Sequence, residues 1–271
     1  MTFIIINLLF WISPLVLTAI IGSIIPFKIV KIRCRNLIDR IYRAAVRIDT
    51  FWLENILGLN IEISGHPPSN RNEKLLVISN HQSWFDIFIL QSAVTGKGPL
   101  LKFLVKRALV YVPVIGWICL ALNFPLLNRS ADKVKRRLDY DSVASAAIQL
   151  RESPVALLNF VEGTRFTKKK KAEQNSPYEV LLKPRSGGLK IMMDNLPEAK
   201  ILDITLIYPN DQLSFWQCLS GKLKTIKVHI DEHHMNEFID INSELEALWR
   251  SKDQRIIQSR KLSKVAQYPL S

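Results

Sequence analysis

The chain is 271 residues long and carries 37 lysines and arginines against 24 acidic residues, a formal net charge of +13. This excess predicts an anionic partner, and the length allows one large domain or two small ones. The three cysteines, Cys34, Cys119 and Cys218, are odd in number and far apart, so they fit neither a disulfide framework nor a zinc site. We expect them to be reduced residues of a cytosolic core.

The first predicted element is an uncharged run from Thr2 to Phe27. A helix needs about 20 apolar residues to cross a bilayer core, so this run predicts a membrane anchor. It lacks the basic leader and the small-x-small cleavage site of a signal peptide. Pro14 and Pro26 leave two arrangements open, a kinked span and a re-entrant hairpin of two short helices. A buried core helix is the alternative.

A strongly basic segment follows, with apolar residues at helical intervals. Its cations are Lys28, Lys31, Arg33, Arg35, Arg40, Arg43 and Arg47. By the positive-inside rule this segment and the rest of the chain stay in the cytoplasm. Each cation near the surface adds about 1 kcal/mol of attraction to anionic lipids. We therefore predict an amphipathic helix along the membrane at residues 28–50, with anionic membrane lipids rather than nucleic acid as partner.

Short apolar runs alternate with helical patterns in the rest of the chain. Strands are predicted at residues 59–64, 74–79, 154–161, 201–208 and 224–230. Helical patterns are found at residues 84–94, 132–151 and 235–262. The alternation predicts an α/β fold, a layered domain with a mixed, mostly parallel sheet flanked by helices and preceded by a membrane-embedded helical segment. We expect a membrane anchor with its basic helix at residues 1–50 and the second domain at residues 51–271.

Two polar clusters begin where a predicted strand ends, one after Ser79 and one after Val161. Ligands of α/β sheets collect at the carboxyl ends of the strands. The first cluster places His81 five residues before Asp86, which suits general base catalysis on a hydroxyl, with the carboxylate fixing the imidazole. The sequence has no Gly-x-Ser-x-Gly elbow, so the hydroxyl is expected to belong to the substrate. This spacing alone is weak evidence.

Three sequence blocks in order together resemble the glycerophospholipid acyltransferase family, which includes lysophosphatidate acyltransferases. The first block, Asn-His-x4-Asp, is matched by Asn80, His81 and Asp86. The second block runs from a lysine expected on a helix to a late arginine, and its matches are Lys106, Pro113, Gly116, Trp117 and Arg129. The third block, Glu-Gly-Thr-Arg, is matched by Glu162, Gly163, Thr164 and Arg165. The resemblance covers residues 75–210.

The resemblance implies a chemical role for each block. His81 is expected to act as general base on a glycerol hydroxyl that attacks an acyl thioester, and Asp86 to orient the histidine. The donor would be acyl-coenzyme A or an acyl carrier protein. No metal and no bound cofactor is expected, because the thioester is already an activated acyl group.

The remaining matched residues are implied to bind the acceptor. Arg165 would hold its phosphate, since the planar guanidinium suits bidentate contacts. Lys106 and Arg129 would share that charge, with Lys102 as a further helper. Gly163 would let backbone amides approach the anion. In the same substrate-binding block, Glu162 and Thr164 are expected to shape the loop.

The sequence departs from the family pattern in its fourth block, where Asp203 and Ile204 occupy the place of a proline-containing strand. The second block also has Asn123 and Phe124 where glycine is common. The fourth block lines the acceptor or acyl site in the family, so that departure concerns substrate preference. Residues 181–190 resemble a branch that includes bacterial inner-membrane members and animal lysocardiolipin-type enzymes.

The expected protein is thus an acyltransferase of a membrane, the bacterial inner membrane, with its catalytic domain on the cytoplasmic side. Lysophosphatidic acid is the leading acceptor, and lysophosphatidylglycerol or a lysocardiolipin-like lipid is the alternative. Two readings from other classes are a noncatalytic membrane-surface protein that binds anionic lipid and a membrane-tethered hydrolase. The lysine run 168–171 is expected to be a solvated loop or a contact with headgroups.

Overall fold

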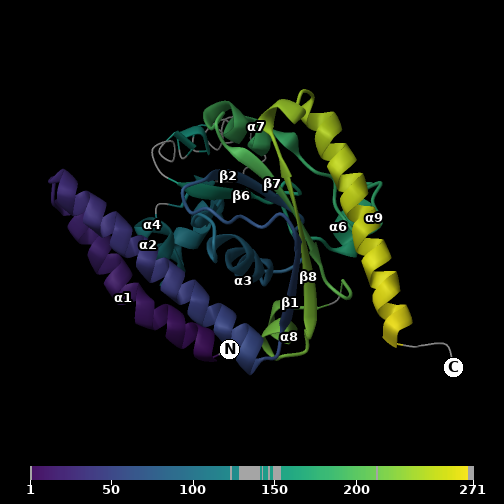
Figure 1. The fold of residues 1–271 in the computed structure, drawn as a ribbon, viewed down its shortest axis with the longest axis horizontal. Helices are drawn as coiled ribbons and strands as arrows, with labels where there is room; N and C mark the ends of the chain where they lie inside the picture. Colours follow the sequence, from purple (N-terminus) through teal and green to yellow (C-terminus); the bar gives the residue numbers. More distant parts are fainter. Residues whose placement is uncertain are drawn as a thin grey trace.

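The computed structural model describes residues 2–122, 124–127, 141, 143–145, 147–148, 154–211 and 213–267. In this part of the chain a six-stranded sheet lies between two layers of helices, and a long helical hairpin leans against one side (Figure 1). The strands are β1 (Asn60–Gly65), β2 (Lys74–Ser79), β3 (Leu101–Phe103), β4 (Val105–Lys106), β5 (Leu126–Leu127), β6 (Val155–Asn159), β7 (Lys200–Ile207) and β8 (Thr225–His233).

Two long helices form the hairpin, and shorter ones cover the sheet. The α-helices are α1 (Thr2–Ile24), α2 (Lys28–Phe51), α3 (Asp86–Leu90), α4 (Ile115–Ala121), α6 (Lys168–Glu173), α7 (Ser186–Asn195), α8 (Phe215–Leu219) and α9 (Ile241–Gln267). Short π or 3₁₀ turns are η1 (Trp52–Ile56), η2 (Gln91–Thr95), η3 (Arg107–Tyr111) and η4 (Met235–Glu237).

The large sheet has the strand order β1-β8-β7-β2-β6-β3. Its neighbouring strands are parallel except for β7 and β8, which are antiparallel. The predicted mixed, mostly parallel sheet is therefore confirmed. Because β2, β6 and β7 are parallel neighbours, the residues that follow them meet at one edge of the sheet.

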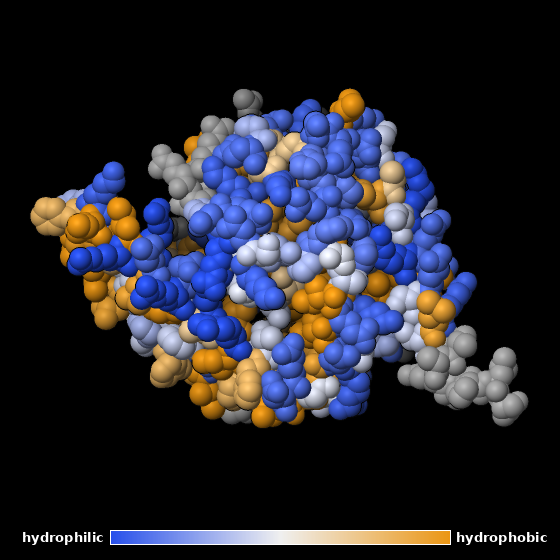
Figure 2. Space-filling view, in the orientation of Figure 1, coloured by the Kyte–Doolittle hydropathy of each residue, from blue (hydrophilic) through white to orange (hydrophobic). Residues whose placement is uncertain are grey.

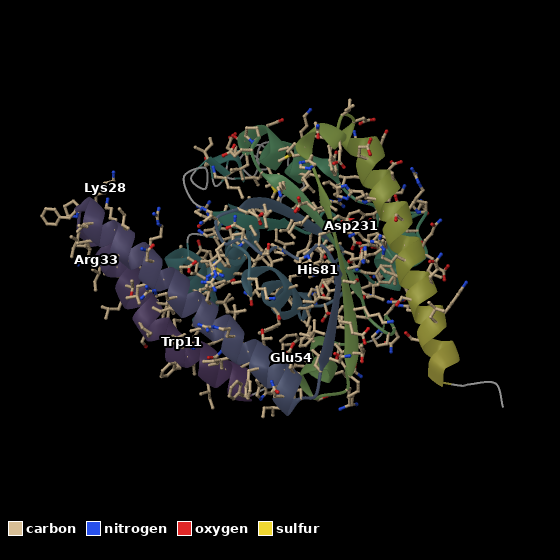
Figure 3. The ribbon with its side chains drawn as sticks, viewed as in Figure 1. Trp11, Lys28, Arg33, Glu54, His81 and Asp231 are labelled. Carbon is tan, nitrogen blue, oxygen red and sulfur yellow. The ribbon has the colours of Figure 1, made fainter. Side chains whose placement is uncertain are left out.

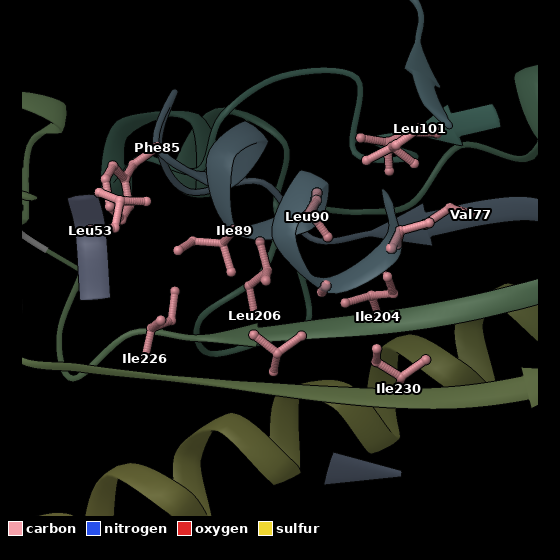
Figure 4. Close-up of a cluster of buried hydrophobic side chains, with 14 of the residues drawn as sticks. Leu53, Val77, Phe85, Ile89, Leu90, Leu101, Ile204, Leu206, Ile226 and Ile230 are labelled. Atoms are coloured by element: carbon pink, nitrogen blue, oxygen red, sulfur yellow. The ribbon is translucent and has the colours of Figure 1, made fainter. Parts of the chain in front are cut away.

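Each face of the sheet carries its own hydrophobic core. On the face covered by α3, side chains such as Leu206 of β7 and Ile89 of α3 are fully buried (Figure 4). On the other face, α7 and α9 cover the sheet, with Met192 and Trp249 fully buried. β7 contributes side chains to both cores, because successive side chains of a strand point to opposite faces of the sheet. Its residues 201–206 are all buried, which explains the nearly continuous apolar run in the sequence.

The hairpin of α1 and α2 is fastened to the domain at its base. Phe3 stacks on Trp52 with 5.5 Å between ring centroids, and Ile4 is buried in the core of the α3 face. Asn7 Nδ2 donates to Asp49 Oδ1 at 2.8 Å, a buried contact between the two helices. The N-terminal end of α1 is thus part of the folded domain.

The second half of α2 also packs on the domain. Tyr42 Oη donates to the carbonyl of Leu101 at 3.0 Å. Arg43, expected near lipid headgroups, is buried instead. Its Nη1 donates to the carbonyls of Thr95 at 2.6 Å and Gly98 at 2.9 Å. The prediction for Arg43 is therefore wrong, because its guanidinium joins α2 to the end of η2 and the turn after it.

Several other expectations differ in detail from the structure. Pro14 lies inside α1 without dividing it, so the pair of short helices is not formed. Lys106 lies on the two-residue strand β4 rather than on a helix. The predicted helix 132–151 falls largely outside the described residues. Of the three cysteines, all free, Cys34 is only half-buried.

Candidate active site

His81 and Asp86 form a hydrogen-bonded pair at the carboxyl end of β2. His81 lies in the loop after this strand, near the centre of the domain, and Asp86 is the first residue of α3 (Figure 3). Their Nδ1 and Oδ2 atoms are 2.7 Å apart. Asp86 is fully buried, while His81 keeps 9% of its surface exposed. The carboxylate therefore reaches back from the helix to the loop.

The loop itself fixes Asp86. The backbone N–H groups of Gln82 and Ser83 donate to Asp86 Oδ2 at 2.7 and 3.0 Å. Tyr208, the residue after β7, donates its hydroxyl proton to Asp86 Oδ1 at 2.6 Å. Burial is the main cause that raises the pKa of Tyr208 well above its usual value, and the nearby Asp86 charge adds to it. These donors hold the carboxylate of Asp86 in one position.

The imidazole of His81 is also fixed by its neighbours. Its ring stacks on Phe160, the residue after β6, with 3.9 Å between centroids. The backbone N–H of Phe166 donates to the carbonyl of His81 at 2.7 Å. Since Nδ1 faces the carboxylate of Asp86, it carries the proton. Nε2 is then the basic nitrogen, and no described residue hydrogen bonds to it.

Asn80 joins β2 to β7 at the same place. Its Nδ2 donates to the carbonyl of Leu206 at 2.9 Å, and its Oδ1 accepts from the N–H of Leu206 at 2.8 Å. The amide side chain of Asn80 thus makes the two hydrogen bonds to β7 that a backbone N–H and carbonyl would make. It holds the start of the histidine loop at the end of its strand.

The Glu-Gly-Thr-Arg loop lies beside the histidine loop because β6 is the parallel neighbour of β2. Gly163 has φ of 71°, a conformation that favours glycine. The Arg165 guanidinium lies 5.0 Å above the ring of Trp84, which belongs to the histidine loop. Thr164 Oγ1 accepts from Lys170 Nζ at 2.7 Å. Lys170 belongs to α6, so the lysine run forms a helix that partly supports this loop.

Glu162 lies in the interior. Its Oε1 accepts from the indole N–H of Trp249, in α9, at 3.4 Å. Burial raises the pKa of Glu162 to about 8, against the opposing effect of this indole and of the backbone N–H groups of His81 and Leu182. The buried carboxyl group therefore connects the histidine loop and the Glu-Gly-Thr-Arg loop to α9.

The structure also places Arg185 at the loop. A Cβ on Gly163 would lie 3.7 Å from Arg185 Nη1, and the N–H of Arg185 donates to the carbonyl of Val161 at 2.8 Å. Two further cations, Lys106 and Arg129, were predicted to share this charge. Only the backbone of Lys106 is described, and Arg129 lies outside the described residues.

Sequence reasoning missed Tyr208, Phe160 and Arg185 as parts of this site. Tyr208 and Phe160 each follow the end of a strand that neighbours β2. The same rule that singled out His81, a side chain after the carboxyl end of a parallel strand, would have found them. Asp203, the departure in the fourth block, lies elsewhere, on the face of β7 covered by α9. There Lys252 Nζ donates to Asp203 Oδ1 at 2.6 Å.

No group of three histidine, cysteine, aspartate or glutamate side chains suitable for a metal ion occurs among the described residues. The histidines of β8 pair with acids instead. His229 contacts Asp231 at 3.0 Å, and His233 contacts Glu237 at 3.0 Å.

Comparisons with known proteins agree with this geometry. A family model described as Acyltransferase matches residues 60–209. Mouse lysocardiolipin acyltransferase 1 is 25% identical over 259 residues, covering 87% of this chain and 67% of that protein. The Arabidopsis thaliana 1-acyl-sn-glycerol-3-phosphate acyltransferase 3 is 28% identical over 264 residues, covering 88% of this chain and 67% of that protein.

A solved structure shares the fold. The 1-acyl-sn-glycerophosphate (LPA) acyltransferase PlsC from Thermotoga maritima superposes with a TM-score of 0.59 at 13% identity, covering 96% of this chain and 95% of that one. The matched residues 60–209 contain His81, Asp86 and the whole Glu-Gly-Thr-Arg loop, and they are more than half of the chain. The chain therefore belongs to the acyltransferase family.

Proposed function

We propose that this acyltransferase moves a fatty acyl chain from a thioester donor to the free hydroxyl of a lysophospholipid at a membrane. The observation that supports this most directly is the 2.7 Å contact between His81 Nδ1 and Asp86 Oδ2. It leaves Nε2 of a partly exposed histidine as a base, beside a loop that carries Arg165. Such a pair suits proton removal from a hydroxyl that the substrate brings.

The reaction then needs few groups from the protein. His81 Nε2 takes the proton of the acceptor hydroxyl while its oxygen attacks the thioester carbonyl. The tetrahedral intermediate collapses, the carbon–sulfur bond breaks, and the leaving thiolate takes the proton back from the imidazolium. Asp86 stabilises the imidazolium, and Tyr208 keeps the carboxylate in place. One ester forms and one thioester is lost, so protons and bonds balance.

The acceptor's phosphate would be bound by arginines of the neighbouring loops. Arg165 is exposed and lies over Trp84, and Arg185 lies next to Gly163. Two guanidinium groups around a glycine with positive φ form a suitable cradle for a dianion, since each offers bidentate contacts. Lys106 and Arg129 remain further candidates for this charge.

Attachment to a membrane is supported by the hairpin. Residues 3–24 form the one described helix long and apolar enough to cross a bilayer, and 28% of its most apolar stretch is buried. However, its first turn packs on Trp52 and in the domain core. Its other end leads to Lys28 and Arg33 at the free end of the hairpin (Figure 3). A helix held along α2 in this way suits insertion into one leaflet from the cytoplasmic side better than a full span.

Lysophosphatidic acid is the acceptor to test first, because relatives at 28% identity are named for acylglycerol phosphate. Lysophosphatidylglycerol and lysocardiolipin come second, since a relative at 25% identity is a lysocardiolipin acyltransferase. The donor is acyl-coenzyme A or an acylated carrier protein. The bacterial inner membrane is the proposed location.

The deciding experiment uses the detergent-solubilised full chain, a labelled thioester donor of each kind and a panel of lysophospholipids. The native chain should form diacyl product, and His81→Ala should reduce the rate by about 10²–10⁴-fold. The exposed turn residue His66 provides the matched control, because His66→Ala should keep native activity.

The alternatives give other products. A hydrolase would release free fatty acid at the same rate with and without lysophospholipid. A noncatalytic lipid-binding protein would bind lipid equally well as the native chain and as the His81→Ala variant. It would form no product from either donor. Either result would reject the proposed transfer.

A further inference from the structure

A large cleft separates the free half of the hairpin from the domain, away from the candidate active site. Its volume is about 1080 Å³. Apolar residues line it from both sides, including Val16 and Ile20 of α1 and Trp117 and Leu120 of α4. A smaller cavity of about 300 Å³ continues it along α2 and shares the lining residue Arg71. Pockets for small molecules commonly have volumes of about 300–1,000 Å³.

The cleft lies at the opposite edge of the sheet from His81. Arg71 lines the cleft and precedes β2, whereas His81 follows the last residue of that strand. A strand of six residues spans roughly 17–20 Å. At β6 the same holds, since Val155 at its start lines the cleft and the Glu-Gly-Thr-Arg loop follows its end. A ligand in the cleft would therefore not occupy the active site.

The polar part of the cleft is strongly cationic. Its cations, from α2, β3 and the loop before β2, are Lys31, Arg35, Arg40, Arg43, Arg47, Arg71 and Lys102. Asp39 is the only acid among the described lining residues, and it pairs with Arg43 Nε at 2.9 Å. In Figure 2 strongly hydrophilic side chains gather over α2 on this side of the molecule. Among the described lining residues, positive charge therefore exceeds negative charge, which favours an anionic ligand.

Lys102 is half-buried, whereas Arg40, Arg47 and Arg71 are exposed. Burial lowers its pKa to about 8, and no described residue accepts a hydrogen bond from its Nζ. A desolvated ammonium that no described residue neutralises is unfavourable, and a bound anion would favour its charged form. Lys102 was expected to help bind the acceptor. Its side chain lines this cleft instead.

We propose that the cleft between the hairpin and the domain binds an anionic phospholipid of the membrane, separately from the active site. The phosphate would contact Arg71, Lys102 and Arg40 of α2, and an acyl chain would lie between α1 and α4. A small inorganic anion would contact only the cations of the cleft. The apolar walls favour a ligand that also carries an acyl chain. The inference rests on the proposed attachment to a membrane.

The test measures binding rather than catalysis. The full chain in phospholipid-free detergent micelles is titrated with phosphatidylglycerol whose chains carry bromine, which quenches nearby tryptophans. Trp117 lines the cleft, so we expect saturable quenching that is largely lost in Trp117→Phe. Brominated phosphatidylcholine should bind at least about tenfold more weakly, because it offers no net charge.

Two variants test the cations. The double variant Arg40→Gln and Arg71→Gln should weaken phosphatidylglycerol binding by about tenfold or more. The control is Arg250→Gln, an exposed arginine of α9, which should leave binding unchanged. Equal quenching by both lipids, or unchanged binding by the double variant, would overturn the proposal. Competition by inorganic phosphate as effective as that by the lipid would identify a phosphate site and also overturn it.

Failure of this inference is distinguishable from failure of the proposed function. His81→Ala should bind phosphatidylglycerol like the native chain. Lipid binding without any transferase activity would reject only the proposed reaction. Transferase activity without saturable quenching through Trp117 would reject only the lipid site.

Discussion

Tyr208 and Asp86 are joined by a buried hydrogen bond of 2.6 Å, although they are 122 positions apart in the chain. This bond connects the end of β7 to the pair of His81 and Asp86, which otherwise depends on the ends of β2 and β6. It also occupies the carboxylate oxygen that does not face His81. Residues that follow β2, β6 and β7 therefore together position the imidazole of His81.

Replacing Tyr208 with phenylalanine should slow the reaction and destabilise the fold. The change leaves Asp86 Oδ1 buried without this donor, which costs about 1–3 kcal/mol. A less constrained Asp86 should reduce kcat by about tenfold with little effect on the KM of the acceptor. Urea unfolding and initial rates would measure both effects. Tyr178→Phe is the control, since the Tyr178 hydroxyl makes only a 3.5 Å contact with the carbonyl of Glu246. A native kcat in Tyr208→Phe would contradict the positioning role.

Glu162 should make the protein less stable as the pH rises. Burial raises its pKa from 4.5 to about 8. The unfolded chain therefore releases this proton near pH 4.5, whereas the folded protein keeps it up to about pH 8. Between these values the folded state binds more protons, so its stability falls with rising pH by at most about 1.4 kcal/mol per pH unit.

The test compares Glu162→Gln, which cannot release the proton, with the native chain. Free energies of unfolding from urea titrations at pH 6.5 and pH 8 should fall less in the variant. Asp49, whose pKa burial raises to about 6, acts mainly below this range. The same decrease in both proteins would mean that Glu162 is ionised in the fold.

Lys252 and Asp203 form a buried ion pair that should not tolerate the loss of one partner. Lys252 is fully buried, and its Nζ also donates to the carbonyl of Ile204 at 2.7 Å. Lys252→Met should cost about 3–5 kcal/mol, because the Asp203 carboxylate remains buried without its cation. The double change with Asp203→Leu should recover most of this loss. The control is Arg250→Met, on the exposed face of α9, with an expected effect within about 0.5 kcal/mol.

Arg185 should affect acceptor binding more than chemistry. Arg185→Gln removes a guanidinium next to Gly163, so the KM for a lysophospholipid acceptor should rise about tenfold while kcat stays within about twofold. Rates at varied acceptor concentration and saturating donor would show the change. Lys183→Gln, an exposed neighbour in the same segment, should leave both values near native. A fall in kcat alone would place Arg185 outside the phosphate site.

The parts of the fold predictable from sequence were those with strong local patterns. β2, β6 and β7 are continuous apolar runs because both of their faces are buried, and each lies within two residues of its predicted bounds. The pair of His81 and Asp86 was predictable because the two residues are only five positions apart in the sequence. The contacts of Asp86 with Tyr208 and of Lys252 with Asp203 were not, since each joins distant segments and leaves no local pattern. β3, β4 and β5 were missed because strands of two or three residues have no periodicity to detect.

The position of β8 between β1 and β7 has a consequence for synthesis of the chain. β1 pairs only with β8, and β8 begins at Thr225, late in the sequence. The sheet therefore cannot close until most of the chain has left the ribosome, and α9 follows later still. The apolar α1 is made before β8, so its docking site at Trp52 and in the core is still incomplete when it emerges. With the proposed attachment to a membrane, we expect targeting to precede completion of the acyltransferase fold.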